Sequence, residues 1–192
     1  MKKTLYVASK NHGKINEYQR MLFNVNCQLL SQPESIEVIE DGLSFEENAM
    51  KKACEVAKRT NSFSIADDSG LCIDSLDGRP GIFSSRYAEN DLKRIQRVLS
   101  ELDGKKNREA YFVAHICVAS PEGKVVLNSE GRCYGNILHK PRGDDGFGYD
   151  PIFQEVSSAL SFAEMGYELK KQFSHRGRAL EKIIPDLVKI FN

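Results

Sequence analysis

Residues 44–70, SFEENAMKKACEVAKRTNSFSIADDSG, decide the fold class, because a capped helix is followed at once by a strand. Ser44 and Glu47 predict a capping box, in which the Ser44 hydroxyl accepts from the Glu47 backbone N–H and the Glu47 side chain reaches back. Apolar residues then recur at helical spacing to about residue 58: Ala49, Ala53, Val56 and Ala57. Residues 63–66 predict a short strand that runs into Asp67-Asp68-Ser69-Gly70.

The segments on either side continue the alternation of strands and helices. We expect a buried strand over residues 5–8, a helix over residues 14–23 and another helix over residues 91–102. Residues 111–119 and 124–132 predict a hairpin with a short loop. Because strands and helices alternate first and a hairpin follows, the sequence predicts a mixed α/β fold.

The end of the chain predicts a terminal helix. Ser174 is the expected N-cap, and Pro185 should kink or divide the helix. The expected apolar face consists of Leu180, Ile183, Ile184, Leu187 and Ile190. The glycine-rich residues 131–148 are the one loose stretch, and they favour a functional loop over a domain linker.

Composition limits the class of protein. The 192 residues, 41% of them hydrophobic, fit a single domain over residues 1–192, or one compact body with two lobes. Lys plus Arg and Asp plus Glu each total 27, and a net charge of zero argues against a partner that is a nucleic acid polymer. No apolar run approaches the roughly 20 residues of a membrane helix, so we expect no membrane partner. Five scattered cysteines without metal or redox spacing predict reduced thiols and a cytoplasmic location.

The first candidate site follows the first strand and opens the next helix. Backbone N–H groups at a helix start, with hydroxyl, amide and ammonium groups around them, suit a chain of phosphates. The motif is not a Walker sequence, and taken alone a polar loop with a solvated lysine is its commoner meaning. The residues of this site are Ser9, Lys10, Asn11, His12, Gly13 and Lys14.

Four carboxylates form the second candidate site: Glu40, Glu47, Asp67 and Asp68. Magnesium bound to a nucleotide is typically held by one or two carboxylates together with the phosphates. A strand that ends in Asp-Asp-Ser-Gly can present a metal ligand and a proton acceptor side by side. Taken singly, Glu47 is better explained as a helix cap and Asp67 or Asp68 as a turn residue, and charge alone does not separate these interpretations.

Two further groups lie late in the chain. Phe147 and Tyr149 can stack on a base, and Asp150 can accept from ring N–H groups; an aromatic turn packed into the core is the alternative. Lys170, together with Ser174-His175-Arg176, can bind a phosphate or a base carbonyl, although a lone histidine at a helix start is more often structural.

Together these groups resemble the inosine triphosphate pyrophosphatases, also described as pyrophosphatases of noncanonical purine nucleoside triphosphates. Chance does not explain so many matches in the family's own order along nearly the whole chain. The matching strings are Ser9-x-Asn11-x-x-Lys14 and residues 40–49, 66–71, 80–81 with 85–88, 146–153, 162–165 and 174–176.

The resemblance implies an elongated two-lobed α/β fold, with a central mixed β-sheet flanked by helices, an active-site cleft between the lobes and a homodimer. It implies hydrolysis of free ITP, dITP and XTP to nucleoside monophosphate and pyrophosphate, which cleanses the nucleotide pool. It also implies Mg²⁺ as the cofactor, with Mn²⁺ able to substitute.

The resemblance assigns roles to residues. Glu40 and Asp68 would bind the metal, and Asp68 would also accept the proton of the attacking water. Ser9 to Lys14 would hold the triphosphate. The remaining implied substrate contacts are Ser69, Phe147, Gly148, Tyr149, Asp150, Lys170, His175 and Arg176. A site that donates to a 6-oxo group and accepts from N1–H would reject adenine.

Two alternatives stay open. A pyrophosphatase for modified pyrimidine or methylated nucleotides would prefer different bases. A non-catalytic nucleotide-binding sensor would bind ITP without releasing pyrophosphate. Whether Glu47 and Asp67 assist metal binding is open as well.

Overall fold

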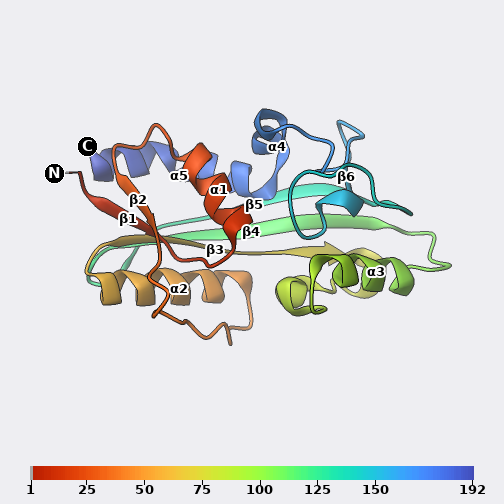
Figure 1. Cartoon of the computed structure of the whole chain (residues 1–192), viewed down its shortest axis with the longest axis horizontal. Helices are drawn as coiled ribbons and strands as arrows, with labels where there is room; N and C mark the ends of the chain where they lie inside the picture. The colour runs from red at the N-terminus through yellow and green to blue at the C-terminus, as the bar shows by residue number, and fades with distance from the viewer. Residues whose placement is uncertain (1) are drawn as a thin grey trace. The chain divides into compact units, whose positions relative to one another are not determined.

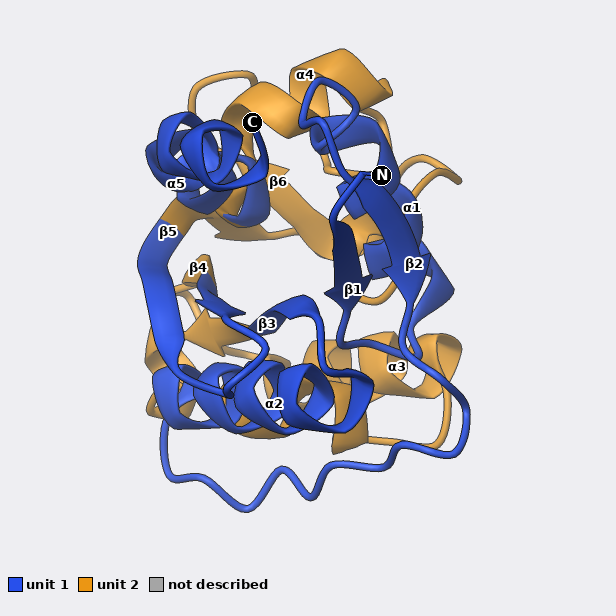
Figure 2. Ribbon diagram, turned by 90° about the vertical axis from the view of Figure 1, so that its left-hand side faces the viewer, with its two compact units in different colours: residues 1–68, 114–131, 176–192 blue, residues 69–113, 132–175 orange. Residues whose placement is uncertain are grey.

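The structure is a computed structural model that describes residues 2–192, and the chain divides into two compact units. Figure 2 distinguishes them by colour, with unit 1 in blue and unit 2 in orange. Unit 1 comprises residues 1–68, 114–131 and 176–192, and unit 2 comprises residues 69–113 and 132–175. Each unit is assembled from segments distant in the sequence, so each depends on long-range contacts.

Within residues 2–192, six strands form one hydrogen-bonded sheet in the order β2-β1-β3-β4-β5-β6 (Figure 1). β1 pairs in parallel with both β2 and β3, whereas β5 and β6 pair in the antiparallel direction. The predicted mixed α/β fold is therefore confirmed. The strands are β1 (Thr4–Val7), β2 (Gln28–Ser31), β3 (Phe63–Ile73), β4 (Glu109–Ala119), β5 (Val125–Ile137) and β6 (Phe153–Glu155).

The core of unit 1 is built largely from small side chains. α2 (Phe45–Thr60) packs its alanine-rich face in a cluster that consists of Ala8, Ile36, Ala49, Ala53, Val56, Ala57, Ala66, Cys117 and Ala119. Because such small side chains let a helix approach a strand closely, a polar side chain carried on the same face can reach the strand. The unit also contains α1 (His12–Met21) and, from residue 176 on, α5 (His175–Phe191).

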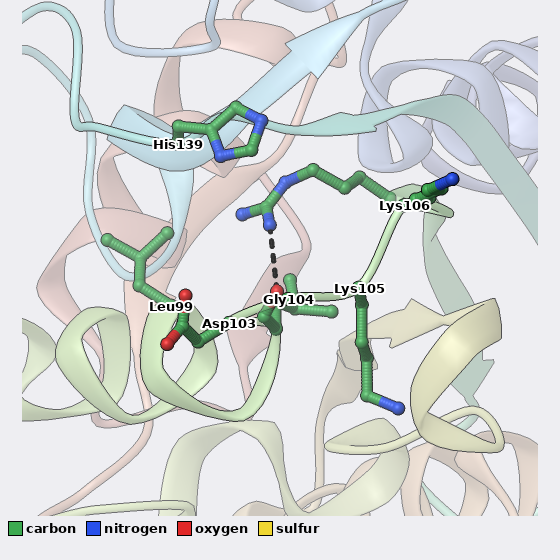
Figure 3. Close-up of a pocket in the computed structure, with 8 residues that line it drawn as sticks. Leu99, Asp103, Gly104, Lys105, Lys106 and His139 are labelled. Atoms are coloured by element: carbon green, nitrogen blue, oxygen red, sulfur yellow. Dashed lines mark hydrogen bonds between the residues drawn. The ribbon is translucent and has the colours of Figure 1, made fainter.

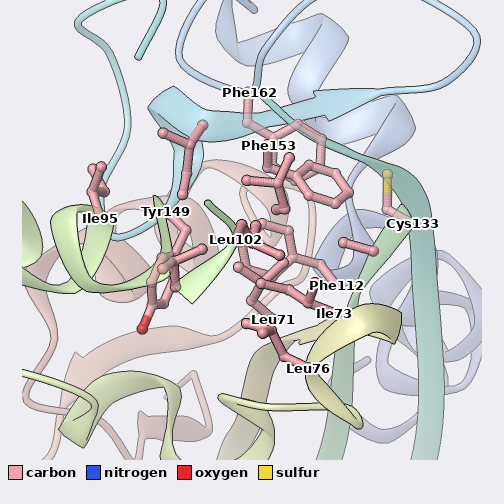
Figure 4. Packing of buried hydrophobic residues seen from close by; sticks show 14 of the residues in the cluster. Leu71, Ile73, Leu76, Ile95, Leu102, Phe112, Cys133, Tyr149, Phe153 and Phe162 are labelled. Atoms are coloured by element: carbon pink, nitrogen blue, oxygen red, sulfur yellow. The ribbon is translucent and has the colours of Figure 1, made fainter. Parts of the chain in front are cut away.

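The core of unit 2 combines aliphatic side chains with a group of aromatic rings (Figure 4). The Phe112 ring lies with its centroid 4.7 Å from that of Phe153 and 5.6 Å from that of Phe162. The helices of this unit are α3 (Asp91–Glu101) and α4 (Tyr167–Phe173), with short 3₁₀ turns at Asp74–Leu76, Gly81–Arg86 and Asp150–Ile152.

The expected helices are present, with small differences at their ends. The Ser44 hydroxyl accepts from the Glu47 backbone N–H at 3.1 Å, as predicted. The Glu47 side chain, however, accepts from the Leu43 backbone N–H at 2.8 Å rather than reaching back to Ser44. α1 begins at His12, two residues before the predicted start, because Asn11 is its N-cap.

One expectation was wrong, and for Pro185 one of the two expected effects is excluded. β3 does not end at Ala66 but continues to Ile73 with Asp67 and Asp68 inside it, because side chains of neighbouring elements bind both carboxylates. α5 runs through Pro185 without being divided. Its buried apolar residues on both sides of the proline pack into unit 1, and this packing outweighs one lost backbone hydrogen bond. β2, β6 and α4 were not predicted, and β5 takes up part of the expected loop over 131–148.

Two predictions from composition can be compared with the structure. In the described part of the chain, no helix combines the length and the apolar character that crossing a membrane requires. All five cysteines are free thiols, and Cys72, Cys117 and Cys133 are buried.

Candidate active site

The loop that follows β1 is ordered by its own polar side chains. The Ser9 hydroxyl accepts from the Asn11 backbone N–H at 3.1 Å, and the Asn11 side chain accepts from the Lys14 backbone N–H at 3.2 Å. The first turn of α1 therefore begins here, where helical N–H groups lack carbonyl partners of their own helix. Of the six predicted residues, Lys10, Asn11 and His12 are exposed, and Ser9, Gly13 and Lys14 are half-buried.

The side chain of Lys14 belongs to a buried network of ion pairs in unit 1. Its ammonium group lies 3.0 Å from Asp67 Oδ2. The same oxygen accepts from Arg176 Nη2 at 2.8 Å and from Arg176 Nε at 3.2 Å. Arg176 Nη1 also contacts Glu17 Oε2 at 2.5 Å. The network thus joins α1, β3 and α5.

Burial and charge oppose each other in this network. Burial raises the pKa of Asp67, but the facing cations Arg176 and Lys14 outweigh it and hold that pKa far below its usual range. Burial also lowers the pKa of Lys14, and Asp67 offsets this only in part. Asp67 is therefore an anion at neutral pH, and Lys14 loses its proton more readily than an exposed lysine.

Asp68, the next residue of β3, has different partners because successive strand side chains point to opposite faces. Its Oδ2 accepts from Asn48 Nδ2 at 3.1 Å, and its Oδ1 lies 3.5 Å from Lys52 Nζ. The Lys52 ammonium also donates to Glu40 Oε1 at 2.7 Å. One ammonium group therefore contacts both of the carboxylates to which the family resemblance assigns a metal.

The two neighbouring aspartates have opposite pKa shifts. Burial raises the pKa of Asp68, and Lys52 and Lys14 oppose this without cancelling it. The pKa of Asp67 is instead lowered. Carboxylates whose environments push their pKa values apart are typical of acid–base sites. Ser69 follows on the same strand and is half-buried.

The donor set around Glu40 and Asp68 fits a magnesium ion. Both carboxylates direct oxygen atoms at the cation Lys52, so their geometry already suits a shared positive charge. Among residues 2–192, no group of three or more His, Cys, Asp and Glu side chains could hold a metal alone. Magnesium that arrives with a nucleotide needs only one or two protein carboxylates, because phosphates and water complete its oxygen ligands.

The predicted base-binding residues form a second group, in unit 2. Asp150 Oδ2 accepts from the Phe147 backbone N–H at 2.8 Å and lies 2.7 Å from Lys170 Nζ. The Lys170 ammonium also lies 5.0 Å from the centroid of the Phe147 ring, a cation–π distance. A glycine is required at position 146, because its φ is +83° and a Cβ would lie 2.1 Å from Asp150 Oδ2.

Other predicted residues of this unit lie deeper. Tyr149 is 4% exposed and donates its hydroxyl to a backbone carbonyl at 2.8 Å. His175 is 6% exposed, and its ring stacks on Phe112 with centroids 4.8 Å apart. Gly148 is half-buried and donates its N–H to Asp91 Oδ2 at 2.8 Å. Tyr149 and His175 are therefore buried in unit 2 rather than facing solvent.

Sequence reasoning missed three residues of the site. Asn48 and Lys52 contact Asp68, and Glu17 contacts Arg176. A signal for Lys52 was present, because it lies on the face of α2 that buries Asn48, Ala49 and Val56. A lysine on the buried face of a helix requires an acidic partner, and the sequence offered Asp67 and Asp68 on the strand that follows. Glu17 had no comparable signal.

A concavity elsewhere in unit 2 contains none of the predicted residues (Figure 3). It has a volume of about 490 Å³ and lies beyond the end of α3, with His139, Lys105 and Lys106 at its edge. Its Arg108 guanidinium donates to three backbone carbonyls at 2.6 to 3.2 Å. Arg108 therefore has a structural role, since it holds residue 102 close to residues 137 and 138. The concavity is not a candidate for catalysis.

The chain is similar to known proteins over nearly its whole length. The family model of the Ham1 family matches residues 5–186. A dITP/XTP pyrophosphatase from Prochlorococcus marinus subsp. pastoris is 66% identical over 190 residues, which cover 99% of this chain and 100% of the relative. A dITP/XTP pyrophosphatase from Nostoc sp. is 48% identical over 192 residues and covers 100% and 98% of the two chains.

A solved structure is similar over the same extent. The structure of a HAM1 protein from Coxiella burnetii aligns with a TM-score of 0.88 and 38% sequence identity, covering 97% of this chain and 99% of that one. Sequence and fold therefore agree over nearly the full length, and the chain belongs to the Ham1 family.

Proposed function

We propose that this chain hydrolyses noncanonical purine nucleoside triphosphates, namely ITP, dITP and XTP, to nucleoside monophosphate and pyrophosphate. Its relatives from Prochlorococcus and Nostoc are dITP/XTP pyrophosphatases, and it aligns with both almost from end to end. The observation that carries the proposal is the convergence in unit 1 of two carboxylates, Glu40 and Asp68, with the ammonium groups of Lys52 and Lys14. A protein that only bound nucleotides would not need a buried carboxylate with a raised pKa there.

The triphosphate is assigned to unit 1. A triphosphate resists attack by water because it is itself negatively charged, so cations must neutralise it. Lys14 supplies one ammonium group, and the start of α1 supplies backbone N–H groups with Ser9 and Asn11 beside them. Lys52, which sequence reasoning missed, supplies a second ammonium group.

Proton transfer is assigned to Asp68. Its raised pKa brings it closer to the range in which a carboxylate accepts a proton effectively near neutral pH. Asn48 holds one of its oxygens and so orients the carboxylate. Glu40 and Asp68 would hold Mg²⁺, and Mn²⁺ should substitute because it takes the same oxygen ligands. Bound with the nucleotide, such an ion would add positive charge against the phosphates.

Base selection is assigned to unit 2. The Phe147 ring is half-buried and can stack on a purine, while Lys170 can donate to a 6-oxo group and Asp150 can accept from N1–H. Adenine presents a 6-amino group and no N1–H, so it would match neither the donor Lys170 nor the acceptor Asp150. Tyr149 and His175, which are buried, stay predicted substrate contacts. Ser69 and Gly148 remain predicted substrate contacts.

A panel of triphosphates tests the proposal. With Mg²⁺ present, purified protein should release pyrophosphate from ITP, dITP and XTP much faster than from ATP or GTP. Equal turnover of all five would refute the selectivity. Faster turnover of modified pyrimidine or methylated nucleotides would favour the first alternative. Binding of ITP without pyrophosphate release would favour a sensor.

The proposal also covers the domain organisation, the oligomeric state and the cellular location of the protein. We expect residues 1–192 to act as one enzyme domain with its active site in a cleft between two lobes, to form a homodimer and to work in the cytoplasm. Light scattering on the purified protein tests the dimer, since one chain has a mass of 21.6 kDa. A measured mass equal to that of one chain at micromolar concentration would contradict it.

A further inference from the structure

Asp67 has no part in the reaction described above, yet three strong contacts meet at its carboxylate. Lys14 Nζ lies 3.0 Å from its Oδ2, and two nitrogens of Arg176 lie 2.8 Å and 3.2 Å from the same oxygen. The other oxygen, Oδ1, is buried without a hydrogen-bond partner among residues 2–192. The side chain is 0% exposed.

This burial excludes Asp67 as a direct ligand of substrate. An anion held close to a triphosphate would repel it unless cations lay between them. The cation that neighbours Asp67 and belongs to the proposed phosphate site is Lys14, which retains 14% side-chain exposure. Any influence of Asp67 on the substrate therefore passes through Lys14.

Arg176 binds the same oxygen of Asp67 as Lys14 does. Its guanidinium is 2% exposed and donates to Asp67 with two nitrogens and to Glu17 with a third. Glu17 and Lys14 both belong to α1, three residues apart and thus on neighbouring positions of one helical face. The guanidinium therefore connects α1 to β3, the two elements that carry Lys14 and Asp67.

We propose that Asp67 is a positioning residue that holds the Lys14 ammonium in place for the phosphates, and that Arg176 anchors Asp67. A lysine side chain is flexible, and fixing its ammonium beforehand removes the entropy lost on binding. This proposal deepens the function proposed for the same site and rests on it.

A double-mutant cycle separates positioning from a merely structural role. The variants are Asp67→Asn, Lys14→Met and the two combined, and the readout is binding of inorganic pyrophosphate with Mg²⁺ by calorimetry. Asp67→Asn alone should weaken binding by roughly tenfold. In the Lys14→Met background it should change nothing further, because its effect passes through Lys14. Equal losses in both backgrounds would overturn the proposal.

A control variant tests whether the loss of any aspartate–lysine pair weakens binding, and a replacement variant covers a failure to fold. Asp186→Asn removes an aspartate that pairs with a lysine, Lys189, on the exposed surface of the same unit, and it should leave pyrophosphate binding unchanged. If Asp67→Asn does not fold, the charge-balanced pair Asp67→Asn with Arg176→Gln replaces it in the cycle, with the same two expectations.

Two outcomes distinguish this proposal from the function on which it rests. If wild-type protein binds pyrophosphate but Lys14→Met binds it equally well, the phosphate site itself is wrong, and the proposal fails with it. If Lys14→Met weakens binding while Asp67→Asn alone does not, only the positioning role fails.

Discussion

The charged network of unit 1 and the aromatic cluster of unit 2 place their polar groups by different means. In unit 1, each charged side chain is held by other charges, as Asp67 is by Lys14 and Arg176. In unit 2, the pair of Asp150 and Lys170 lies against phenylalanine rings, which fix it by shape. Charged groups held in fixed positions can bind phosphates and transfer protons. A surface shaped by aromatic rings can distinguish one base from another. Substitutions in the two units should therefore affect different steps.

Asp68→Asn should produce the largest effect, because it removes the proton acceptor while keeping the shape of the side chain. We expect the rate of ITP hydrolysis to fall by about a thousandfold. The measurement is kcat for pyrophosphate release, with the thermal unfolding midpoint as a check that the variant folds. Activity near the wild-type level would assign catalysis to another residue.

Asp67→Asn should weaken the fold in a pH-dependent manner. The pKa of Asp67 is lowered in the folded state, so its stabilising contribution is complete above about pH 4, the pKa of an unfolded aspartate, and is lost as pH falls further. At neutral pH, breaking this buried pair should cost about 3 kcal/mol. Urea unfolding of both proteins at pH 7, 5 and 3 measures this. If the difference in unfolding free energy between the two proteins stays constant down to pH 3, the stabilisation by Asp67 is not electrostatic.

Lys170→Met should alter selection in unit 2 without altering phosphate binding in unit 1. Loss of one charged hydrogen-bond donor should lower kcat/KM for ITP by roughly thirtyfold. ATP, which does not offer a 6-oxo group, should lose little. Inorganic pyrophosphate should bind the variant as it binds wild-type protein. An equal fall in kcat/KM for ITP and for ATP would contradict the assignment of base selection to unit 2 and phosphate binding to unit 1.

Removing one helix cap from each unit should have the smallest effect and should be equal in the two. The side chains of Ser44 and Asn90 accept from the Glu47 and Lys93 backbone N–H groups at 3.1 Å and 2.9 Å. Each alanine substitution should lower the unfolding free energy by about 1 kcal/mol. Activity should persist in both variants. Lost activity in Ser44→Ala alone would mean that the start of α2 also positions Lys52.

Local patterns predicted much of the fold. The Ser44 cap and the alanine face of α2 appeared where their spacing indicated, because such features depend on neighbours within one or two turns. The end of β3 was predicted wrongly for the opposite reason. A pair of aspartates indicates a turn when taken alone, yet here Lys14, Arg176, Asn48 and Lys52 bind them inside a strand.

The sequence by itself determined the mixed α/β class, the helix caps and, through the resemblance of its motifs, the family. Only the tertiary structure decided that Asp67 and Asp68 have separate partners and opposite pKa shifts. It also decided that Lys52 joins Glu40 to Asp68 and that Tyr149 lies in the core. The physical reason is that protonation depends on burial and on charges brought together from distant segments, and neither exists until the chain has folded.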